Sequence, residues 1–539
     1  MGTLDHETVG PYRAKEQPIS TIDCVDPAGR RPLGQVKVDS PEAVARALEG
    51  ARAAQRVWGR TSLATRRQVL QRLLEFILEH ANEICNAVVA DTGKTRENAM
   101  LGEIWPVCEK LRWTIRNGER HLRPERVSSG LMLHKKAVIE FHPLGVIGVI
   151  CPWNYPFQNI LGPTIPALMA GNAVVVKASE WSAWSSLYFQ QIFDQVLSAA
   201  GFSPDLVKIV NGYAATGKAL VSSGVDSLLF TGSVENGRRV LEECARNLTP
   251  VILELGGKDP MIICDDADLD QSVHAAVNGV FINAGQNCMS AERLLVFDGV
   301  FDEFRDRVVR LTRGLRQGAS SENELVDVGA IASPIQLDRI ERMVNEAVTG
   351  GARVLIGGKR TLSERGQYFE PTILTDVTPT MAIMQEELFG PVMILHRVHD
   401  EEEAVRIANG TRFGLSSTVM SRNSKRAQRI AEQIIAGSTC INDFGLCYMV
   451  QDLPFGGAKS SGFGRINGRD GLRACTNIKA TLSDRLPMHR ANRLFPVRQG
   501  DYDLALNTIR LLYGKRIAGR VSALAEIAKH TLTRWRHRP

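Results

Sequence analysis

Short, uninterrupted apolar runs alternate with helical stretches from about residue 137 onward, and this alternation restricts the possible folds more than any other feature of the chain. The clearest runs are VIGVI (146–150), NAVVVKAS (172–179), LVKIVNG (206–212) and SLLFTGS (227–233). Unalternated apolar strands separated by helices are typical of a parallel sheet that is covered on both faces. We therefore predict an α/β protein with a doubly wound sheet.

Two other regions complete the predicted organisation. Residues 41–120 have the periodicity of long amphipathic helices, the first of which opens with Ser40 and Pro41. A second strand and helix series follows Cys288, which predicts a second α/β domain with Cys288 near its start. Its strand candidates are RLLVFD (293–298), ARVLIGG (352–358), PVMILHRV (391–398), GLSSTVMS (414–421) and STCIND (438–443).

Composition limits the class of protein. A chain of 539 residues that is 44% hydrophobic is long enough for two or three domains with cores of their own. Its ten cysteines are scattered, with no Cys-x-x-Cys pair and no histidine cluster at metal-ligand spacing. The first 18 residues lack the apolar core of a signal peptide, and the longest apolar run is too short to span a membrane. We expect a cytoplasmic protein with reduced thiols and no metal.

A cysteine in a polar turn is the first candidate for chemistry. Cys288 follows a Gly-Gln-Asn turn in an apolar segment, where a cysteine is either a small buried hydrophobe or a nucleophile. A nucleophile needs a base and a group that stabilises the charge it creates. Asn154, just after the strand 146–150, and Glu254, inside an apolar strand, are the candidates. Each also has a structural interpretation, Asn154 as a turn residue and Glu254 as half of an ion pair.

Two segments are candidates for holding a nucleotide. In FTGSVENGRRV (230–240) a strand turns through Gly232 and Ser233 into a helix whose N-terminus is suited to phosphate, although the Gly-x-Gly-x-x-Gly spacing is absent. Lys177 and Glu180 lie at the end of the predicted strand 172–179 and just after it. They could bind the hydroxyls of a ribose, or they are charged residues exposed to solvent. Each signal is weak by itself.

The order and spacing of these segments together are specific. From residue 20 to 486 the chain resembles the aldehyde dehydrogenase superfamily, and within it a branch of plant and fungal members. The matching segments are PWNYP, GNAVVVKASE, FTGS, ELGGKDP, GQNC, EELFGPV and PFGGAKSSGFGR.

The resemblance implies the aldehyde dehydrogenase fold, with three parts followed by an extension. A Rossmann-like NAD-binding domain would comprise residues 1–127 and 144–257, and an α/β catalytic domain residues 258–469. A β oligomerisation arm would comprise residues 128–143 and 470–487, and its open strand edges imply a homodimer or homotetramer. Residues 488–539 form an extension that the resemblance does not explain.

The resemblance also implies an NAD(P)-dependent enzyme that oxidises an aldehyde to a carboxylic acid. Cys288 would form a thiohemiacetal and then a thioester, Asn154 would stabilise the oxyanion, and Glu254 would activate the hydrolytic water. Two alternatives remain. A catalytically silent binding or structural relative is expected to have lost one of these residues, and a coenzyme A-acylating relative typically lacks the base.

For the cofactor, the resemblance implies contacts along the whole dinucleotide. Glu180 would face the adenosine ribose and repel a 2′-phosphate, which favours NAD over NADP, while Ser179 leaves NADP use open. The predicted cofactor-binding residues are Trp153, Lys177, Glu180, Gly232, Ser233, Glu387 and Phe389.

Two departures from the family pattern bear on chemistry and substrate. Cys151 is a second thiol three residues from Asn154, for which packing and a disulfide with Cys288 are the alternatives. The segment 442–457, which in the family helps line the substrate mouth, is apolar and offers no arginine for a substrate carboxylate. It therefore favours aliphatic or aromatic aldehydes. Its apolar residues are Phe444, Leu446, Tyr448 and Met449.

The positive charge of the chain is concentrated at its end. Residues 488–539 hold eleven Lys and Arg and three Asp and Glu, which gives them a net charge of +8. Because the whole chain has a net charge of +6, the first 487 residues have a net charge of about −2. The tail has no nucleic-acid recognition motif. Its periodicity over 504–532 predicts an amphipathic helix that packs on the parent domain or a partner subunit, or lies on an anionic membrane, which Trp535 also favours. The predicted stripe is Ile509, Tyr513, Ile517, Val521, Leu524 and Ala528.

Overall fold

The parallel strands predicted between residues 146 and 233 lie in one six-stranded sheet of the computed structural model, which describes residues 20–321, 325–361, 366–485 and 495–536. The strand order is β17-β9-β8-β5-β6-β7, with β17 antiparallel to β9 and the other pairs parallel. The strands are β5 (Val146–Ile150), β6 (Ala173–Lys177), β7 (Val207–Val210), β8 (Ser227–Gly232), β9 (Val251–Leu255) and β17 (Gly462–Phe463).

The strand order creates a reversal that positions the site. From β5 the chain proceeds outward through β6 and β7, and then returns to the other side of β5 to place β8 and β9. Ligands of open α/β sheets bind outside the carboxyl ends of the strands at such a reversal. The segments after β5 and β8, which hold Asn154 and Ser233, therefore begin at neighbouring points of one sheet edge.

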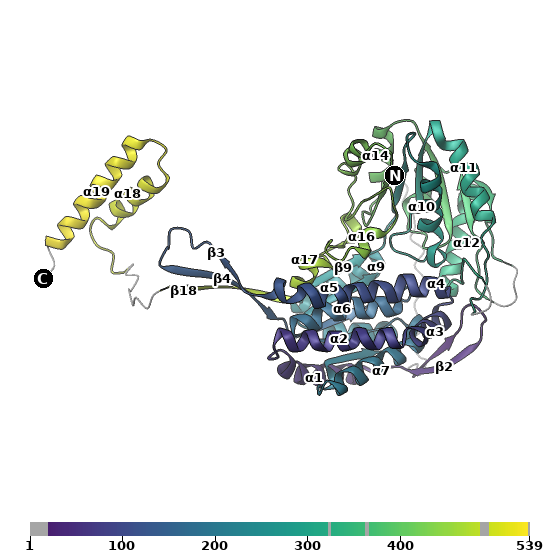
Figure 1. The fold of residues 1–539 in the computed structure, drawn as a ribbon, viewed down its shortest axis with the longest axis horizontal. Helices are drawn as coiled ribbons and strands as arrows, with labels where there is room; N and C mark the ends of the chain where they lie inside the picture. Colours follow the sequence, from purple (N-terminus) through teal and green to yellow (C-terminus); the bar gives the residue numbers. More distant parts are fainter. Residues whose placement is uncertain (1–19, 322–324, 362–365, 486–494, 537–539) are drawn as a thin grey trace, which may run out of the picture. The chain divides into compact units, whose positions relative to one another are not determined.

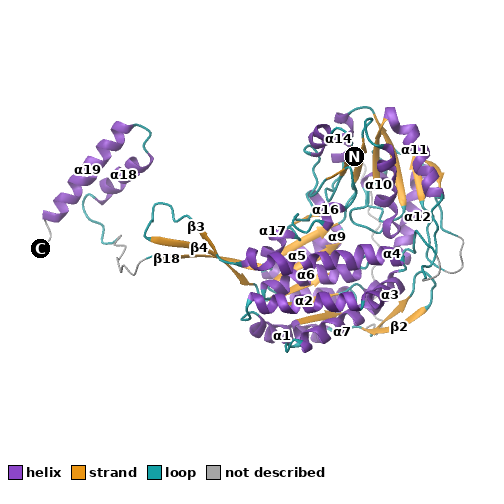
Figure 2. Cartoon of the chain, in the orientation of Figure 1, coloured by secondary structure: helices purple, strands orange, loops and turns teal. Residues whose placement is uncertain are grey.

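Helices cover this sheet as the periodicity predicts (Figures 1 and 2). The first begins after Ser40, whose side chain accepts a hydrogen bond from the backbone N–H of Ala43 at 3.3 Å, and it buries Val44, Leu48 and Ala51. Figure 1 shows α2, α5 and α6 side by side. The helices are α1 (Pro41–Trp58), α2 (Leu63–Glu79), α3 (Ala81–Thr92), α4 (Arg96–Ala99), α5 (Trp105–Leu122), α6 (Pro156–Ala170), α7 (Ala183–Ala199), α8 (Ala214–Ser222) and α9 (Val234–Asn247).

The second strand series forms a seven-stranded sheet of order β12-β13-β14-β11-β10-β15-β16, parallel except for the β12–β13 pair. Its strands are β10 (Pro260–Ile263), β11 (Arg293–Phe297), β12 (Arg353–Ile356), β13 (Thr372–Thr375), β14 (Val392–Val398), β15 (Thr418–Met420) and β16 (Cys440–Ile441). Its helices are α10 (Leu269–Phe281), α11 (Asp298–Arg313), α12 (Pro334–Thr349), α13 (Ala382–Gln385), α14 (Glu401–Asn409), α15 (Ser424–Ala431) and α16 (Leu446–Met449).

Each large sheet has its own hydrophobic core. One core is built on β5 to β8 and the helices from α1 to α8, and the other on β10, β11, β13 and β14 with α10, α11 and α12. The central strands of both sheets are fully buried, which explains why their sequences do not alternate.

The remaining strands form two small sheets. An antiparallel pair joins β1 (Thr21–Val25) to β2 (Pro32–Lys37). A three-stranded sheet of order β18-β4-β3 contains β3 (Glu125–Val127), β4 (Lys135–Pro143) and β18 (Thr476–Asp484). The predicted arm boundary at residue 470 falls inside the helix α17 (Gly468–Ala474), which contacts α5 and α6.

The chain divides into two compact units, and both α/β sheets belong to the larger one, which comprises residues 1–125 and 138–481. The smaller unit comprises residues 126–137 and 482–539 and contains α18 (Asp501–Tyr513) and α19 (Ile517–Arg536). None of the described helices is both long enough and apolar enough to cross a membrane.

The prediction of one helix over residues 504–532 is wrong, because the helix breaks at Gly514, whose φ of −64° and ψ of 130° are extended. The two helices contact each other through a different face from the predicted stripe. Ala523 is buried, and Leu504, Leu511 and Ile527 are half-buried. All six stripe residues are exposed. The side chain of Trp535 lies outside the described residues.

Candidate active site

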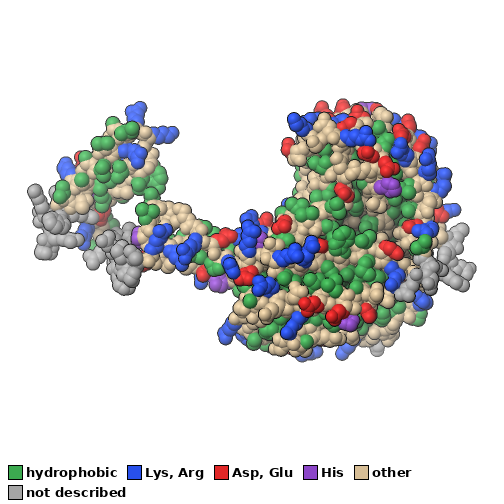
Figure 3. All heavy atoms as spheres, in the orientation of Figure 1, with side chains coloured by type: hydrophobic (Ala, Val, Ile, Leu, Met, Phe, Trp, Pro, Cys, Tyr) green, Lys and Arg blue, Asp and Glu red, His purple; other side chains and the backbone are tan. Residues whose placement is uncertain are grey.

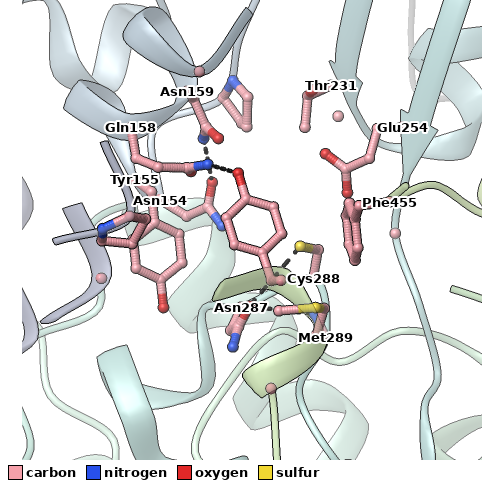
Figure 4. Close-up of a pocket in the computed structure, with 18 of the residues that line it drawn as sticks. Asn154, Tyr155, Gln158, Asn159, Thr231, Glu254, Asn287, Cys288, Met289 and Phe455 are labelled. Carbon is pink, nitrogen blue, oxygen red and sulfur yellow. Dashed lines mark hydrogen bonds between the residues drawn. The ribbon is translucent and has the colours of Figure 1, made fainter. Parts of the chain in front are cut away.

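A cavity of about 410 Å³ lies at the carboxyl ends of β5, β8 and β9, between the two large sheets. Cys288, Glu254 and Asn154 all line it (Figure 4). So do five of the seven predicted cofactor residues, namely Trp153, Gly232, Ser233, Glu387 and Phe389. The cavity falls within the size range of small-molecule sites.

Cys288 reaches the cavity through a strained turn. Asn283 and Ala284, with φ of 51° and 54°, and Gly285, with φ of 71°, are successive residues in the left-handed region. A Cβ atom on Gly285 would lie 2.0 Å from the carbonyl oxygen of Gly390, so only glycine fits there. Backbone strain of this kind persists where the surrounding structure enforces it, and it is common at active sites.

The thiol of Cys288 is protonated at neutral pH in this environment. Burial raises its pKa well above the usual value, and the charges of Glu254, Asp259 and Glu387 raise it further. Its Sγ contacts the Oδ1 of Asn287 at 3.8 Å (Figure 4). The thiolate, rather than the thiol, is the nucleophilic form, so a base has to remove the proton.

Glu254 on β9 has the properties of a general base. Its side chain is 6% exposed, and its Oε1 has no hydrogen-bond partner among the atoms that the structure describes. Burial raises the pKa of Glu254 to about 7, and interactions with Cys288 and Thr231 offset only part of the rise. A carboxylate with this pKa can accept or release a proton at neutral pH.

Asn154 occupies the turn between β5 and α6, and polar contacts hold both its backbone and its side chain. Its Nδ2 donates to the carbonyl of Gln286, two residues before Cys288, at 3.2 Å. Its Oδ1 accepts from the Nδ2 of Asn159 at 3.2 Å. In Figure 4 Asn154 and Glu254 flank the sulfur of Cys288 on opposite sides. An amide donor, a buried carboxylate and a thiol therefore line the same cavity.

The other end of the cavity is polar and aromatic. The Oε1 of Glu387 accepts from the backbone N–H of Gly257 at 3.1 Å, and burial raises the pKa of Glu387 to about 8. A Cβ atom on Gly256 would lie 2.2 Å from both Glu387 oxygens, so glycine is required for this approach. Phe389 and Trp153 meet edge to face, with ring centroids 5.6 Å apart.

Ser233 caps the helix that starts at this end of the cavity. Its side chain accepts a hydrogen bond from the backbone N–H of Asn236 at 3.4 Å, at the N-terminus of α9. A helix N-terminus favours an anionic group through its free N–H groups and its dipole. The residues at this end thus fit a ligand that carries both phosphate and a flat ring.

Sequence comparison decides the family. A model of the aldehyde dehydrogenase family matches residues 12–481, most of the chain. The chain belongs to the aldehyde dehydrogenase family. An aldehyde dehydrogenase-like protein of Schizosaccharomyces pombe is 40% identical over 471 residues, which cover 86% of this chain and 90% of that protein. The 4,4′-diapolycopene aldehyde oxidase of Methylomonas is 34% identical over 499 residues, which cover 92% of each.

Solved structures agree with the sequence comparison. The structure of an aldehyde dehydrogenase from Bacillus cereus in complex with NAD⁺ matches with a TM-score of 0.82 and 31% identity, and covers 86% of this chain and 94% of that one. The predicted family, the α/β fold and the class of NAD(P)-dependent aldehyde dehydrogenase are confirmed.

Two predicted cofactor residues of this aldehyde dehydrogenase lie outside the cavity lining. Lys177 ends β6 and is 7% exposed, and Glu180 starts the following turn. The Nζ of Lys177 lies 3.4 Å from the Oε2 of Glu180, which also accepts from the Oγ of Ser179 at 3.3 Å. The two charges therefore pair with each other in this structure.

The mouth of the cavity has the apolar character that its sequence predicts. Phe444, Leu446, Tyr448 and Met449 all line the cavity, three of them from α16. The Nε2 of Gln158 donates to the hydroxyl of Tyr448. Arg339 is the one cationic side chain in the described lining, and its Nη2 donates to the backbone carbonyl of Glu387 at 2.7 Å, at the opposite end.

Several residues that shape this site are absent from the sequence prediction. Gln158 and Asn159 line the cavity from the first turns of α6, and the side chain of Gln286 is bonded to the carbonyls of Asn283 and Ala330. The two polar residues inside the otherwise apolar segment PFQNILG (156–162) are the sequence feature that indicates them.

The thiol of Cys151 points to the carbonyl of Lys177 at 3.7 Å and is not part of the lining. No group of three His, Cys, Asp or Glu in the described ranges is placed to hold a metal.

Proposed function

We propose that the enzyme oxidises an aldehyde to the carboxylic acid through a covalent intermediate on Cys288. The Cys288 thiolate attacks the carbonyl carbon, and the side-chain amide of Asn154 and the backbone N–H of Cys288 stabilise the oxyanion of the thiohemiacetal. NAD supplies the hydride acceptor. Glu254 then removes a proton from the water that hydrolyses the thioester, which releases the acid and regenerates the thiol.

The observation that carries this proposal is the buried Glu254 carboxylate, with an unpartnered oxygen and a pKa of about 7, in the same cavity as Cys288 and Asn154. A buried carboxylate oxygen without a hydrogen-bond partner is costly unless the carboxylate is used. The test is NADH formation by the purified protein over a panel of aldehydes, with the product identified. Absence of NADH formation with every aldehyde would contradict the proposal.

The same residues argue against the two alternatives. A catalytically silent protein has no need of three reactive groups converging in one cavity. A coenzyme A-acylating enzyme passes its thioester to a thiol and has no use for a base that activates water. Release of free acid in the absence of coenzyme A supports hydrolysis, whereas acyl-coenzyme A as the main product contradicts it.

We propose that NAD occupies the polar end of the cavity. Gly256 allows the close approach of the Glu387 carboxylate, and the capped N-terminus of α9 at Ser233 suits the pyrophosphate. Glu387 is suited to the nicotinamide ribose, and Phe389 and Trp153 to the nicotinamide ring. Gly232, which ends β8 just before Ser233, lines the same end of the cavity. The related Bacillus cereus enzyme, solved with NAD⁺, supports this assignment.

We infer that Lys177 and Glu180 bind the hydroxyls of the adenosine ribose, and that NAD is preferred over NADP. The Glu180 side chain is 32% exposed and already opposes Lys177, so a 2′-phosphate would compete with a carboxylate for the same cation.

We propose an apolar aldehyde as substrate. The mouth is lined by Phe444, Leu446 and Met449, and Arg339 is engaged at the other end of the cavity. The relative from Methylomonas, which is named 4,4′-diapolycopene aldehyde oxidase, supports an apolar substrate. A higher kcat/KM for a carboxylated aldehyde such as succinic semialdehyde than for a straight-chain aldehyde of similar length would contradict it.

We propose that residues 1–127 and 144–257 form the NAD-binding domain, that residues 258–469 form the catalytic domain, and that residues 128–143 and 470–487 form an oligomerisation arm of a homodimer or homotetramer. The edge strands β3 and β18 expose Val127, Ile478 and Leu482. Open apolar edges favour pairing with a second copy. A monomer by analytical ultracentrifugation at micromolar concentration would contradict the arm.

A second candidate role concerns the helices α18 and α19, for which we propose a peripheral contact with an anionic membrane in an otherwise cytoplasmic enzyme. Tyr513, Ile517 and Val521 are 61–79% exposed, and Lys515, Arg516 and Arg520 are exposed in the same segment. Figure 3 shows hydrophobic and basic side chains together on these two helices. Exposed apolar side chains next to cations are typical of interfacial helices. Deletion of residues 488–539 should abolish flotation with phosphatidylserine liposomes. Failure of the intact protein to float at low salt would favour a partner subunit as the occupant of this face.

A further inference from the structure

A fully buried ion pair lies behind Asn154, outside the cavity. The Nζ of Lys94 is 2.6 Å from the Oε1 of Glu103, and neither side chain is exposed at all. Two charges are costly to remove from water unless every donor and acceptor is satisfied. The remaining hydrogen bonds of Lys94 and Glu103 therefore show which part of the backbone the pair fixes.

Both partners bind the turn that carries Asn154. The Nζ of Lys94 donates to the backbone carbonyl of Asn154 at 2.7 Å and lies 4.2 Å from the ring centroid of Tyr155. The Oε2 of Glu103 accepts from the backbone N–H of Gln158 at 2.9 Å, in the first turn of α6. The pair thus holds the turn at both of its ends. Glu103 also places a carboxylate at the N-terminus of α6, where the helix dipole favours it.

The backbone around the pair is irregular in ways that bring it to this turn. Glu103 belongs to a π-helix, Met100–Ile104, between α4 and α5. Such turns are rare in proteins as a whole, and many of those that occur lie at functional sites. In the same turn, a Cβ atom on Gly102 would lie 2.6 Å from the ring of Tyr155, so glycine allows the close approach. Lys94 follows Gly93, which ends α3 in the left-handed conformation with φ of 69°.

The side chain of Asn154 depends on the backbone that the pair holds. Its Nδ2 and Oδ1 are fixed by Gln286 and Asn159, and its carbonyl receives a second hydrogen bond from the Nδ2 of Asn283 at 3.0 Å. Asn283 and Gln286 belong to the strained turn before Cys288. The ion pair, the turn of Asn154 and the turn of Cys288 are therefore joined by one continuous set of hydrogen bonds.

We propose that Lys94 and Glu103 are positioning residues of the oxyanion hole, which preset the amide of Asn154 toward the carbonyl oxygen that becomes negatively charged at Cys288. The inference rests on the proposed function, because it gives Asn154 its role. A preset donor stabilises the developing charge without reorganisation, and a displacement of a fraction of an ångström weakens this effect.

Another buried carboxylate nearby offers a matched control. Asp91 lies in the last turn of α3, three residues before Lys94, and is 3% exposed. It accepts hydrogen bonds from the backbone and the Oγ of Ser185 at 2.8 and 2.7 Å, on α7. It does not line the cavity. The variant Asp91→Asn therefore tests a buried carboxylate that lacks any contact with the Asn154 turn.

The test is a double-mutant cycle of Glu103→Gln and Asn154→Ala, measured as kcat for NADH formation. Asn154→Ala should lower kcat by roughly 10²- to 10³-fold, as expected for loss of an oxyanion donor. Glu103→Gln should lower kcat at least about tenfold, with the KM for the aldehyde changed by less than about threefold. The double variant should be within about twofold of Asn154→Ala, since Glu103 acts through Asn154.

Additional measurements separate positioning from general damage to the fold. The rate of Cys288 alkylation by iodoacetamide and the Kd for NAD should be unchanged in Glu103→Gln, because neither needs the oxyanion hole. Asp91→Asn should keep kcat within about twofold. If Glu103→Gln does not fold, Lys94→Met combined with Glu103→Gln removes both charges, keeps an acceptor for Gln158 and should show the same loss of kcat.

Three outcomes would overturn the inference. Multiplicative losses in the double variant would mean that Glu103 acts independently of Asn154. A kcat for Glu103→Gln, or for the charge-free pair, that equals that of Asp91→Asn would mean that the ion pair is only part of the core. Undiminished turnover in Asn154→Ala would instead contradict the proposed function, and the inference with it.

Discussion

The catalytic cavity buries charges, whereas the C-terminal helices expose apolar side chains. Glu254 is buried on β9 and Glu387 is half-buried beside Gly257, and loss of water raises the pKa of Glu254 to about 7 and that of Glu387 to about 8. On α18 and α19, Ile517 and Tyr513 are 79% and 70% exposed, although both are hydrophobic. Each region departs from the usual rule that apolar residues are inside and charged residues outside.

The difference indicates two kinds of function. A buried carboxylate gains reactivity from the loss of water, so chemistry is expected where the charge is enclosed. An exposed apolar face gains nothing until another surface covers it, so association is expected there. Changes in the cavity should therefore affect the rate constants, and changes in α18 and α19 should affect only where or with what the enzyme associates.

The largest effect is expected for Cys288→Ser. We expect kcat to fall by roughly three orders of magnitude or more, because a hydroxyl is a far weaker nucleophile than a thiolate at neutral pH. Binding of NAD, measured by fluorescence, and the thermal unfolding profile should be retained. Turnover close to that of the unchanged protein would show that the cavity does not use this thiol.

Glu254→Gln should slow hydrolysis of the thioester more than hydride transfer. We expect steady-state turnover to fall roughly 10²-fold or more while a pre-steady-state burst of NADH survives. In the unchanged enzyme the rate of hydrolysis should rise as the pH rises through about 7, because Glu254 has to be deprotonated. Loss of the burst together with turnover would assign Glu254 to an earlier step.

The same substitution should stabilise the fold at high pH. Burial raises the pKa of Glu254 from 4.5 to about 7, so ionisation favours the unfolded chain between these values. Stability that is present below pH 4.5 is lost as the pH rises through 7, by at most roughly 3 kcal/mol. We expect Glu254→Gln to raise the Tm at pH 8 and to leave it nearly unchanged at pH 4.5. An equal change at both values would mean that the carboxylate is not desolvated.

A smaller effect is expected for Glu180→Ser, at the edge of the cofactor site. Removal of this carboxylate frees Lys177 and removes repulsion of a 2′-phosphate, so the ratio of kcat/KM for NADP to that for NAD should rise by about tenfold. The KM for the aldehyde should not change. An unaltered cofactor ratio would indicate that Glu180 does not face the ribose.

Local sequence patterns predicted most of the fold. Buried strands such as Ala173–Lys177 are recognisable because every residue is apolar or ends the strand, and Ser40 marks the start of α1 through its cap. The prediction from periodicity was wrong at Gly514, because the spacing of the apolar residues continues unchanged although the helix ends there. Periodicity alone does not detect a break of three residues, 514–516, between two helices whose apolar residues share the same repeat.

The sequence predicted those residues of the candidate site that lie in segments resembling a known family. Cys288, Glu254 and Asn154 lie in segments that resemble a known family, and the structure places all three on one cavity. Lys94 and Glu103 were not predicted, because their burial depends on a π-helix and on the close packing of Gly102 against Tyr155. Such contacts between distant segments have no signature in local sequence.

The smallest effect on catalysis is expected for charge placed on the exposed face of α19, where Leu524 is 54% exposed. Leu524→Asp should leave kcat within about twofold, because surface substitutions away from a site rarely matter, yet it should weaken flotation with anionic liposomes. Ser522→Asp adds the same charge to an exposed position of the same helix outside the predicted stripe, so it controls for electrostatic repulsion alone. If both variants weaken flotation equally, the apolar stripe has no part in binding and only the charge of the tail matters. If Leu524→Asp lowers kcat tenfold, the assignment of chemistry to the cavity and of association to α18 and α19 is wrong.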